Sequence, residues 1–168
     1  GMFLDLFNVD SSQYTGVDIS KKMLEVAKKK YPRYKFLEEN FYSHEGQYDF
    51  CISLFSIPDY FGLSTISKSY DLLKDNGMFV STFINKKGSY KKIHCIEENG
   101  IDYNPYSYTY EEIANELHNL GFTWYYILSI VDTTDSTDVQ KMKNYLIYNK
   151  HSLAHAKYFF VIAQKNET

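Results

Sequence analysis

The segment YTGVDIS, residues 14–20, places a carboxylate where a predicted strand gives way to a predicted helix. Asp18 stands at the carboxyl end of the β-favouring run 14–18, and Ser20 is a residue type that caps helices. A carboxylate at the end of a strand in an open α/β sheet can accept two hydrogen bonds from a ribose diol. The sequence therefore predicts that Asp18 binds a nucleotide. The alternative is an acid that only favours the helix start through the helix dipole.

The elements that would position Asp18 alternate between strand and helix along the chain. Predicted strands cover 14–18, 34–40, 48–55, 78–84, 123–131 and 157–165. Predicted helices run from the cap Ser20 to the stop at Pro32, and over 63–73, 109–122 and 138–156. This order predicts one domain over residues 1–168, a three-layer α/β sandwich with a mostly parallel sheet and an antiparallel last strand.

Three of these elements carry specific burial or capping signals. The run 48–55 is almost continuously apolar, which is typical of a central strand covered on both faces. Helix 109–122 has Thr109 as its cap, Glu112 in capping-box position and Gly121 at its end. In the first helix, one face should be buried, and its members are Met23, Leu24, Val26 and Ala27.

Composition narrows the classes of function. The chain is 44% hydrophobic and 23% charged with a net charge of −3, which favours a globular protein and gives no footprint for nucleic acid. No stretch reaches the ~20 apolar residues of a membrane span. Cys51 and Cys95 lack metal or redox spacing, so we expect reduced thiols and a cytoplasmic location. His151 and His155 lack a third ligand, so we expect no metal site.

Six segments, in order, resemble the class I S-adenosylmethionine-dependent methyltransferases. They span residues 14–165 and read YTGVDISKKMLEVAKKKYP, FLEENF, YDFCISLFSIPDYF, SYDLLKDNGMFVSTF, YSYTYEEIANELHNLGF and YFFVIAQK. The resemblance implies a Rossmann-like sheet that ends in an antiparallel hairpin. It also implies S-adenosylmethionine as the cofactor and a small-molecule methyl acceptor.

The resemblance assigns cofactor contacts to seven residues. Asp18 and Ile19 would frame the ribose and adenine, and the other candidates are Glu39, Asn40 and Phe41 near the adenine and Leu54 and Phe55 on the sulfonium side. Asn40 can equally be a turn residue, and Leu54 and Phe55 can be ordinary packing residues. No catalytic residue is identified, because methyl transfer depends mainly on proximity and orientation. A substrate lid would lie in the loop that holds Tyr103, Tyr106 and Tyr108.

The family's first strand and its GxGxG loop have no counterpart in this sequence. Only six residues separate residues 2–7 from Tyr14, whereas a parallel crossover needs about a dozen. Residues 2–8 are then either the end of the helix that follows a missing first strand, which we favour, or an independent strand. A truncated sheet of this kind exposes central strand edges, which predicts a homodimer.

Two functions follow, and a third, an RNA-associated domain that acts through the lysine-rich helix after Ser20, is disfavoured by the net charge. The first is a methyltransferase that uses S-adenosylmethionine. The second is a degenerate methyltransferase-like domain without catalysis that serves as a binding or assembly module. Cofactor binding would separate the two.

Overall fold

The computed structural model describes residues 2–87, 105–130 and 158–167. The predicted helix 138–156 lies outside these residues, as do Cys95, Tyr103, His151 and His155. The chain divides into two compact units, Gly1–Gly46 (unit 1) and Gln47–Thr168 (unit 2). The expectation of a single domain stays a prediction, and each unit is described by itself.

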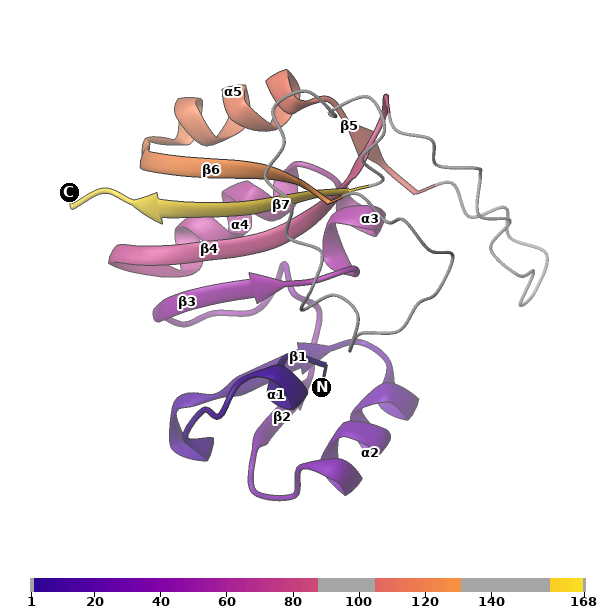
Figure 1. Cartoon of the computed structure of the whole chain (residues 1–168). Helices are drawn as coiled ribbons and strands as arrows, with labels where there is room; N and C mark the ends of the chain where they lie inside the picture. The colour runs from indigo at the N-terminus through magenta and orange to yellow at the C-terminus, as the bar shows by residue number, and fades with distance from the viewer. Residues whose placement is uncertain (1, 88–104, 131–157, 168) are drawn as a thin grey trace. The chain divides into compact units, whose positions relative to one another are not determined.

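Unit 1 contains a two-stranded parallel sheet and short helices (Figure 1). Its elements are α1 (Met2–Leu6), η1 (Ser11–Gln13), β1 (Thr15–Asp18), α2 (Lys21–Lys30) and β2 (Lys35–Glu38). The favoured interpretation of residues 2–8 as helix is confirmed over Met2–Leu6. Helix α2 begins as predicted, since the Ser20 hydroxyl accepts a hydrogen bond from Met23 N–H at 3.3 Å.

The core of unit 1 is small. Leu4, Leu24 and Phe36 are its buried residues. Gly16 allows the Phe36 ring to lie against β1, because a Cβ at Gly16 would come within 2.7 Å of that ring. The predicted apolar face of α2 is wrong at two positions, since Met23 and Val26 are 58% and 59% exposed. Two strands offer too narrow a surface to cover more of α2 than Leu24 and its neighbours.

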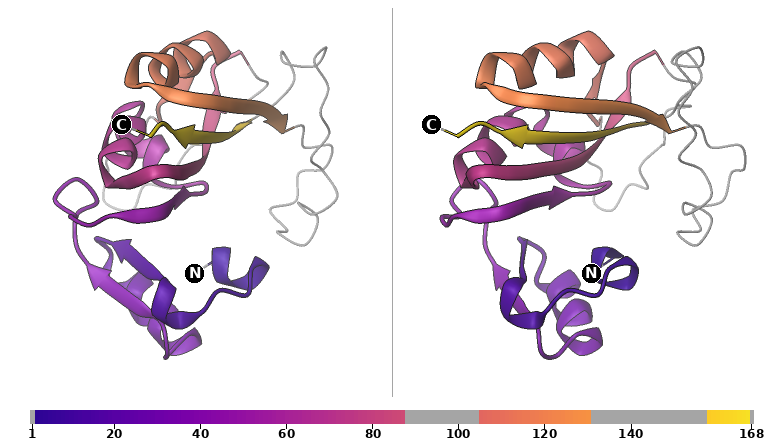
Figure 2. Two further views of the ribbon diagram at one scale, coloured as in Figure 1. Left: turned by 90° about the vertical axis from the view of Figure 1, so that its left-hand side faces the viewer. Right: turned by 60° about the vertical axis from the view of Figure 1, so that its left-hand side comes forward.

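Unit 2 contains a five-stranded mixed sheet with strand order β3-β4-β7-β6, in which β5 pairs with β4 off this path (Figures 1 and 2). The strands are β3 (Tyr48–Ser53), β4 (Leu73–Asn85), β5 (Ser107–Tyr108), β6 (Phe122–Ile130) and β7 (Tyr158–Lys165), and the helices are α3 (Ile57–Phe61), α4 (Ser64–Leu72) and α5 (Tyr110–Leu120). β3 and β4 are parallel, whereas β7 is antiparallel to both β4 and β6. The predicted α/β fold with an antiparallel last strand is confirmed.

Helices α4 and α5 pack on one face of this sheet and form the main core with it. The buried residues are Ile66, Leu73, Phe79, Phe83, Ile113, Leu117, Phe122, Phe159, Val161 and Ala163. The capping box of α5 is present, with Thr109 and Glu112 bonded reciprocally and Gly121 in the left-handed conformation. Strand β4 starts at Leu73 and not at residue 78, with a register irregularity that accommodates Asn76 at φ +61°.

Strand β3 differs most from its sequence pattern. We expected both faces of this strand to be covered, but Phe50 is 59% exposed and Ile52 is 37% exposed. Among the residues that the structure describes, β3 pairs only with β4, and β1 pairs only with β2. The first strand of the family is thus missing from the described sheets, as the sequence predicted. Both β1 and β3 are edge strands there.

Candidate functional site

The carboxyl ends of β1 and β2 lie side by side in unit 1 and bring the acidic candidates together. The strands pair in parallel with Asp18 opposite Glu38. Backbone N–H of Glu39 donates to the carbonyl oxygen of Asp18 at 3.1 Å, which extends the pairing one residue beyond the strands. This is the sheet edge at which ligands bind in open α/β proteins.

Asp18 forms a tight turn that leads into α2. Its Oδ1 accepts a hydrogen bond from Ser20 N–H at 2.8 Å. Within the described residues this is the one hydrogen bond that its side chain makes. Oδ2 therefore retains both of its lone pairs and Oδ1 retains one, which is enough to accept two ribose hydroxyls. The alternative role at the helix start is also met, since the same carboxylate orders the turn before the Ser20 cap.

Glu39 is held by a residue that the sequence did not suggest. His44 is buried, and its Nδ1 lies 3.0 Å from Glu39 Oε2. The backbone N–H of His44 also donates to the carbonyl oxygens of Asn40 and Phe41, which closes the turn after β2. A lone histidine in a polar stretch carries no periodic signal, so only the folded turn reveals this contact.

Asn40 acts within the same turn. Its Oδ1 accepts from Tyr42 N–H at 2.9 Å, and its carbonyl oxygen accepts from Ser43 N–H at 3.0 Å. This is the turn role that the sequence allowed, and the contact with adenine stays a prediction. Ile19 is 65% exposed beside Asp18, and the Phe41 ring packs edge-on against Tyr42. Ile19 thus offers an apolar surface next to the carboxylate.

In unit 2, Leu54 and Phe55 follow β3 at its carboxyl end, and both are half-buried. Phe55 has φ +52°, an uncommon conformation for a residue with a side chain. Its N–H donates to Thr82 Oγ1 at 2.6 Å, and its ring packs edge-on against Tyr158 at 5.0 Å between centroids. Strained backbone fixed in this way is frequent in ligand-binding loops. Thr82 and Tyr158 were not predicted, because they are distant in sequence.

The described residues give little support for a metal site or a nucleophilic cysteine. No group of three His, Cys, Asp or Glu side chains there could hold a metal ion. Burial raises the pKa of the Cys51 thiol to about 12, so this cysteine is a packing residue and not a nucleophile. None of the described helices has the length and apolar character to cross a membrane.

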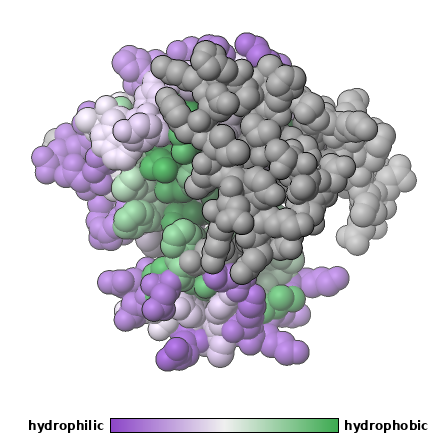
Figure 3. All heavy atoms as spheres, viewed as in Figure 1, coloured by the Kyte–Doolittle hydropathy of each residue, from purple (hydrophilic) through white to green (hydrophobic). Residues whose placement is uncertain are grey.

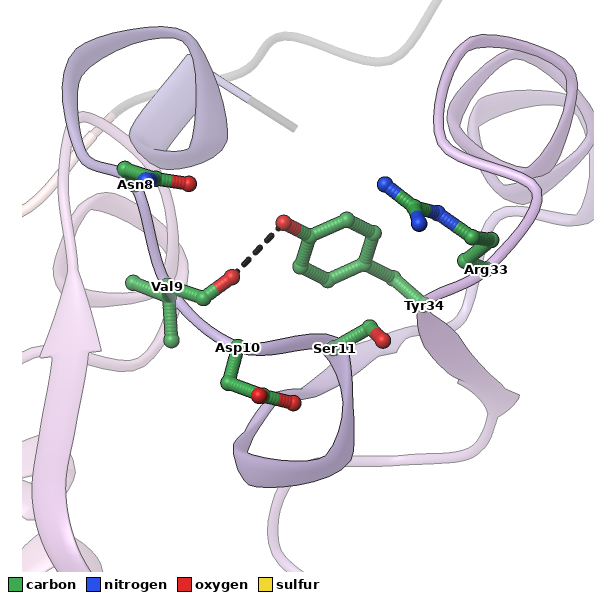
Figure 4. Close-up of a pocket in the computed structure, with 6 residues that line it drawn as sticks. All are labelled: Asn8, Val9, Asp10, Ser11, Arg33 and Tyr34. Atoms are coloured by element: carbon green, nitrogen blue, oxygen red, sulfur yellow. Dashed lines mark hydrogen bonds between the residues drawn. The ribbon is translucent and has the colours of Figure 1, made fainter.

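A polar pocket of about 300 Å³ lies elsewhere in unit 1 (Figure 4). It is lined by the segment before η1 and the residues before β2, namely Asn8, Val9, Asp10, Ser11, Arg33 and Tyr34. Tyr34 OH donates to the Val9 carbonyl oxygen across it at 2.7 Å. All of these residues precede β1 or β2, so the pocket contains none of the seven predicted site residues.

Comparisons with known proteins bear on the family and the fold of this chain. The family model described as a methyltransferase domain matches residues 1–81. No curated protein sequence matches the chain. Many solved structures do, although at low sequence identity.

Three of these structures illustrate the likeness. An S-adenosylmethionine-dependent methyltransferase from Thermotoga maritima has a TM-score of 0.67 and 13% identity over 90% of this chain and 72% of its own. A protein from Listeria monocytogenes that is described as a methyltransferase of the same kind has a TM-score of 0.61 and 18% identity. The match covers 91% of this chain and 79% of that protein. The magnesium protoporphyrin IX methyltransferase of Synechocystis, solved with bound S-adenosylmethionine, has a TM-score of 0.55 and 18% identity. The match covers 90% of this chain and 59% of that enzyme.

These matches confirm the resemblance in the sequence. The chain has the fold of the class I S-adenosylmethionine-dependent methyltransferases, and residues 1–168 contain no GxGxG motif.

Proposed function

We propose that the protein binds S-adenosylmethionine and transfers its methyl group to a small-molecule acceptor. The proposal includes a single domain over residues 1–168. The family match and the fold support it, as do the structural relatives that bind this cofactor or its product. Asp18, Ile19, Glu39, Asn40 and Phe41 would hold the nucleoside. Leu54 and Phe55 would line the sulfonium side, as the resemblance implies.

The observation that carries the proposal is the state of Asp18. Its carboxylate stands at the carboxyl end of a parallel strand, next to the end of a second parallel strand, with acceptor capacity left over. Hydrogen bonds from a ribose diol to a carboxylate are charge-assisted and fix the position of the nucleoside. Methyl transfer depends mainly on proximity and orientation of the reacting groups, so no catalytic residue is assigned.

Calorimetry with S-adenosylmethionine and S-adenosylhomocysteine tests the cofactor site. Asp18→Asn keeps an oxygen that can accept from Ser20 N–H but loses the charge. We expect it to weaken binding roughly 10-fold or more, since hydrogen bonds to charged groups contribute about 1.5–3 kcal/mol. Asp18→Ala removes the turn contact as well and should bind no better.

Asp10→Asn is the matched control. Asp10 Oδ1 accepts a hydrogen bond from Ser12 N–H at 2.8 Å, just as Asp18 accepts one from the residue two positions after it. Asp10, however, lies before β1. This variant should bind the cofactor within about twofold of the wild type, since surface substitutions away from a site have small effects. Equal losses in the two variants would contradict the ribose role of Asp18.

The second candidate is a degenerate domain that acts as a binding or assembly module. The missing glycine-rich loop favours it, because in this class that loop lets the backbone approach the cofactor. Absence of binding by the wild type at millimolar cofactor would select this alternative. Under either function, homodimer formation through the free edges of β1 and β3 stays our proposal.

A further inference from the structure

One face of the unit 2 sheet carries the main core, and no helix among the described residues packs on its opposite face. Side chains alternate between the two faces along each strand, so the pairing register defines the open one. Its first row is Phe50, Met78, Gln164 and Trp124, and its second row is Ile52, Val80, Ile162 and Tyr126. We call these eight residues the open face.

The open face is apolar and accessible. Four of its side chains are strongly exposed, with exposed fractions of 59% for Phe50, 37% for Ile52, 40% for Trp124 and 60% for Tyr126. Figure 3 views the molecule from the side of Figure 1 and shows apolar side chains gathered on the unit 2 surface turned to the viewer. In a sheet with one face toward water, the residues on that face are normally polar and alternate along each strand with the apolar residues of the buried face. Gln164 is the only polar member of this set.

The rim of the open face is polar and carries both charge signs. Lys74 Nζ lies 2.9 Å from Asp49 Oδ2, and Asn76 donates to Glu167 at 3.0 Å. An apolar centre rich in aromatic residues inside a polar rim is the usual anatomy of a protein–protein interface. The face itself has no basic side chain for a nucleic acid or an anionic lipid.

The size of the open face fits one particular occupant. With about 200 Å² for a large side chain, its four exposed members offer roughly 400 Å² and the whole face roughly 500 Å². Two such faces would bury about 1,000 Å² together, which is the lower limit for a specific interface and suits a weak dimer.

We propose that a second copy of this chain covers the open face, sheet against sheet. This proposal does not rest on cofactor binding. It also differs from pairing at the strand edges. The order β3-β4-β7-β6 separates Trp124 on β6 from the edge of β3 by two strands, so pairing at the β3 edge would leave Trp124 exposed, whereas face packing would bury it.

Trp124 is the single tryptophan of the chain and reports on the open face directly. Light scattering should show the mass rising from one chain toward two between about 1 μM and about 500 μM, as weak interfaces require. Over the same range Trp124 emission should shift to the blue, and acrylamide quenching should fall about twofold as the indole is desolvated.

Tyr126→Lys should raise the dissociation constant about 10-fold or more, because it places a charge in the apolar centre. Tyr110→Lys is the matched control, since Tyr110 is an exposed aromatic residue at the start of α5 and lies off the open face. It should dimerise like the wild type.

Two results would overturn the proposal. The first is a wild-type monomer at every concentration. The second is a dimer in which Trp124 quenching does not change, which would assign the contact to a surface other than the open face.

Discussion

Units 1 and 2 bury very different amounts of apolar surface. Among the described residues, the core of unit 1 has three buried residues around a two-stranded sheet, whereas ten buried residues join the sheet of unit 2 to α4 and α5. Because hydrophobic stabilisation scales with the apolar area removed from water, unit 2 should hold most of the free energy of unfolding. A two-stranded sheet alone is marginal in water.

The predicted nucleotide-binding residues lie in the unit with the smaller core. Local hydrogen bonds hold them instead, through the Asp18–Ser20 turn and the contact between Glu39 and His44. Short-range turns can fix side chains accurately without much buried area. The two units therefore differ in what they contribute, since unit 1 orients polar groups and unit 2 supplies apolar packing.

The largest expected effect on stability follows from removal of the Phe83 side chain from the core of unit 2. This residue is fully buried and packs edge-on against Phe79 and Tyr108. Phe83→Ala should lower the free energy of unfolding by about 3–5 kcal/mol, because the deleted ring leaves a cavity. Urea denaturation followed by Trp124 fluorescence measures it.

Phe50→Ala is the control for Phe83. It removes the same side chain from the same sheet, but Phe50 lies on the open face. At about 1 μM protein its effect should stay below about 1 kcal/mol, as for most exposed positions. Similar losses for both variants would mean that the open face is packed within one chain.

A smaller effect, confined to unit 1, should follow from Gly16→Val. The new Cβ would lie 2.7 Å from the Phe36 ring, so the ring or β1 must shift. Overpacking of this kind costs about 1–3 kcal/mol. Hydrogen exchange should rise in peptides covering β1, α2 and β2 while the Trp124 transition of unit 2 keeps its midpoint. Thr15→Val, one position away in the same strand, is the control and should leave exchange unchanged.

Much of this architecture could be predicted from sequence because local residues determine it. Ser20 at the start of α2 and the Thr109, Glu112 and Gly121 signals of α5 act within one helical turn, and the structure has all of them. The antiparallel last strand and the missing first strand followed from segment order and crossover length.

What could not be predicted depends on neighbours distant in sequence. An apolar run such as β3 indicates potential burial, but whether Phe50 is covered depends on which strands and helices surround it. The wrong predictions of burial for Met23 and Val26 have the same cause. In the candidate site, Asp18 followed from its place at a strand end, whereas the Phe55–Thr82 contact joins residues 27 positions apart. No local pattern encodes such a pair.

The smallest expected effect concerns pH and compares one exposed ion pair in each unit. In unit 1, Asp5 of α1 accepts hydrogen bonds from Lys30 at 2.8 Å and from the Tyr31 hydroxyl, and these bonds hold the pKa of Asp5 below its usual 3.8. A carboxylate with a lowered pKa stabilises the fold above the unfolded value, and this contribution is lost as the pH falls through the folded one. After correction for the intrinsic pH dependence of amide exchange, the protection factors of α1 and α2 peptides should therefore fall slightly below about pH 4 in the wild type.

Asp5→Asn should show the lower protection factors already at pH 7, and these should respond less to acid because the titrating group is gone. In unit 2 the pair is Asp49 with Lys74, and a hydrogen bond from Lys74 likewise lowers the pKa of Asp49. Asp49→Asn should leave α1 and α2 unaffected and change only peptides near β3, where the larger core should mute the response. If Asp5→Asn alters β3 peptides as much as its own, the two units share their stability, and the contrast between them fails.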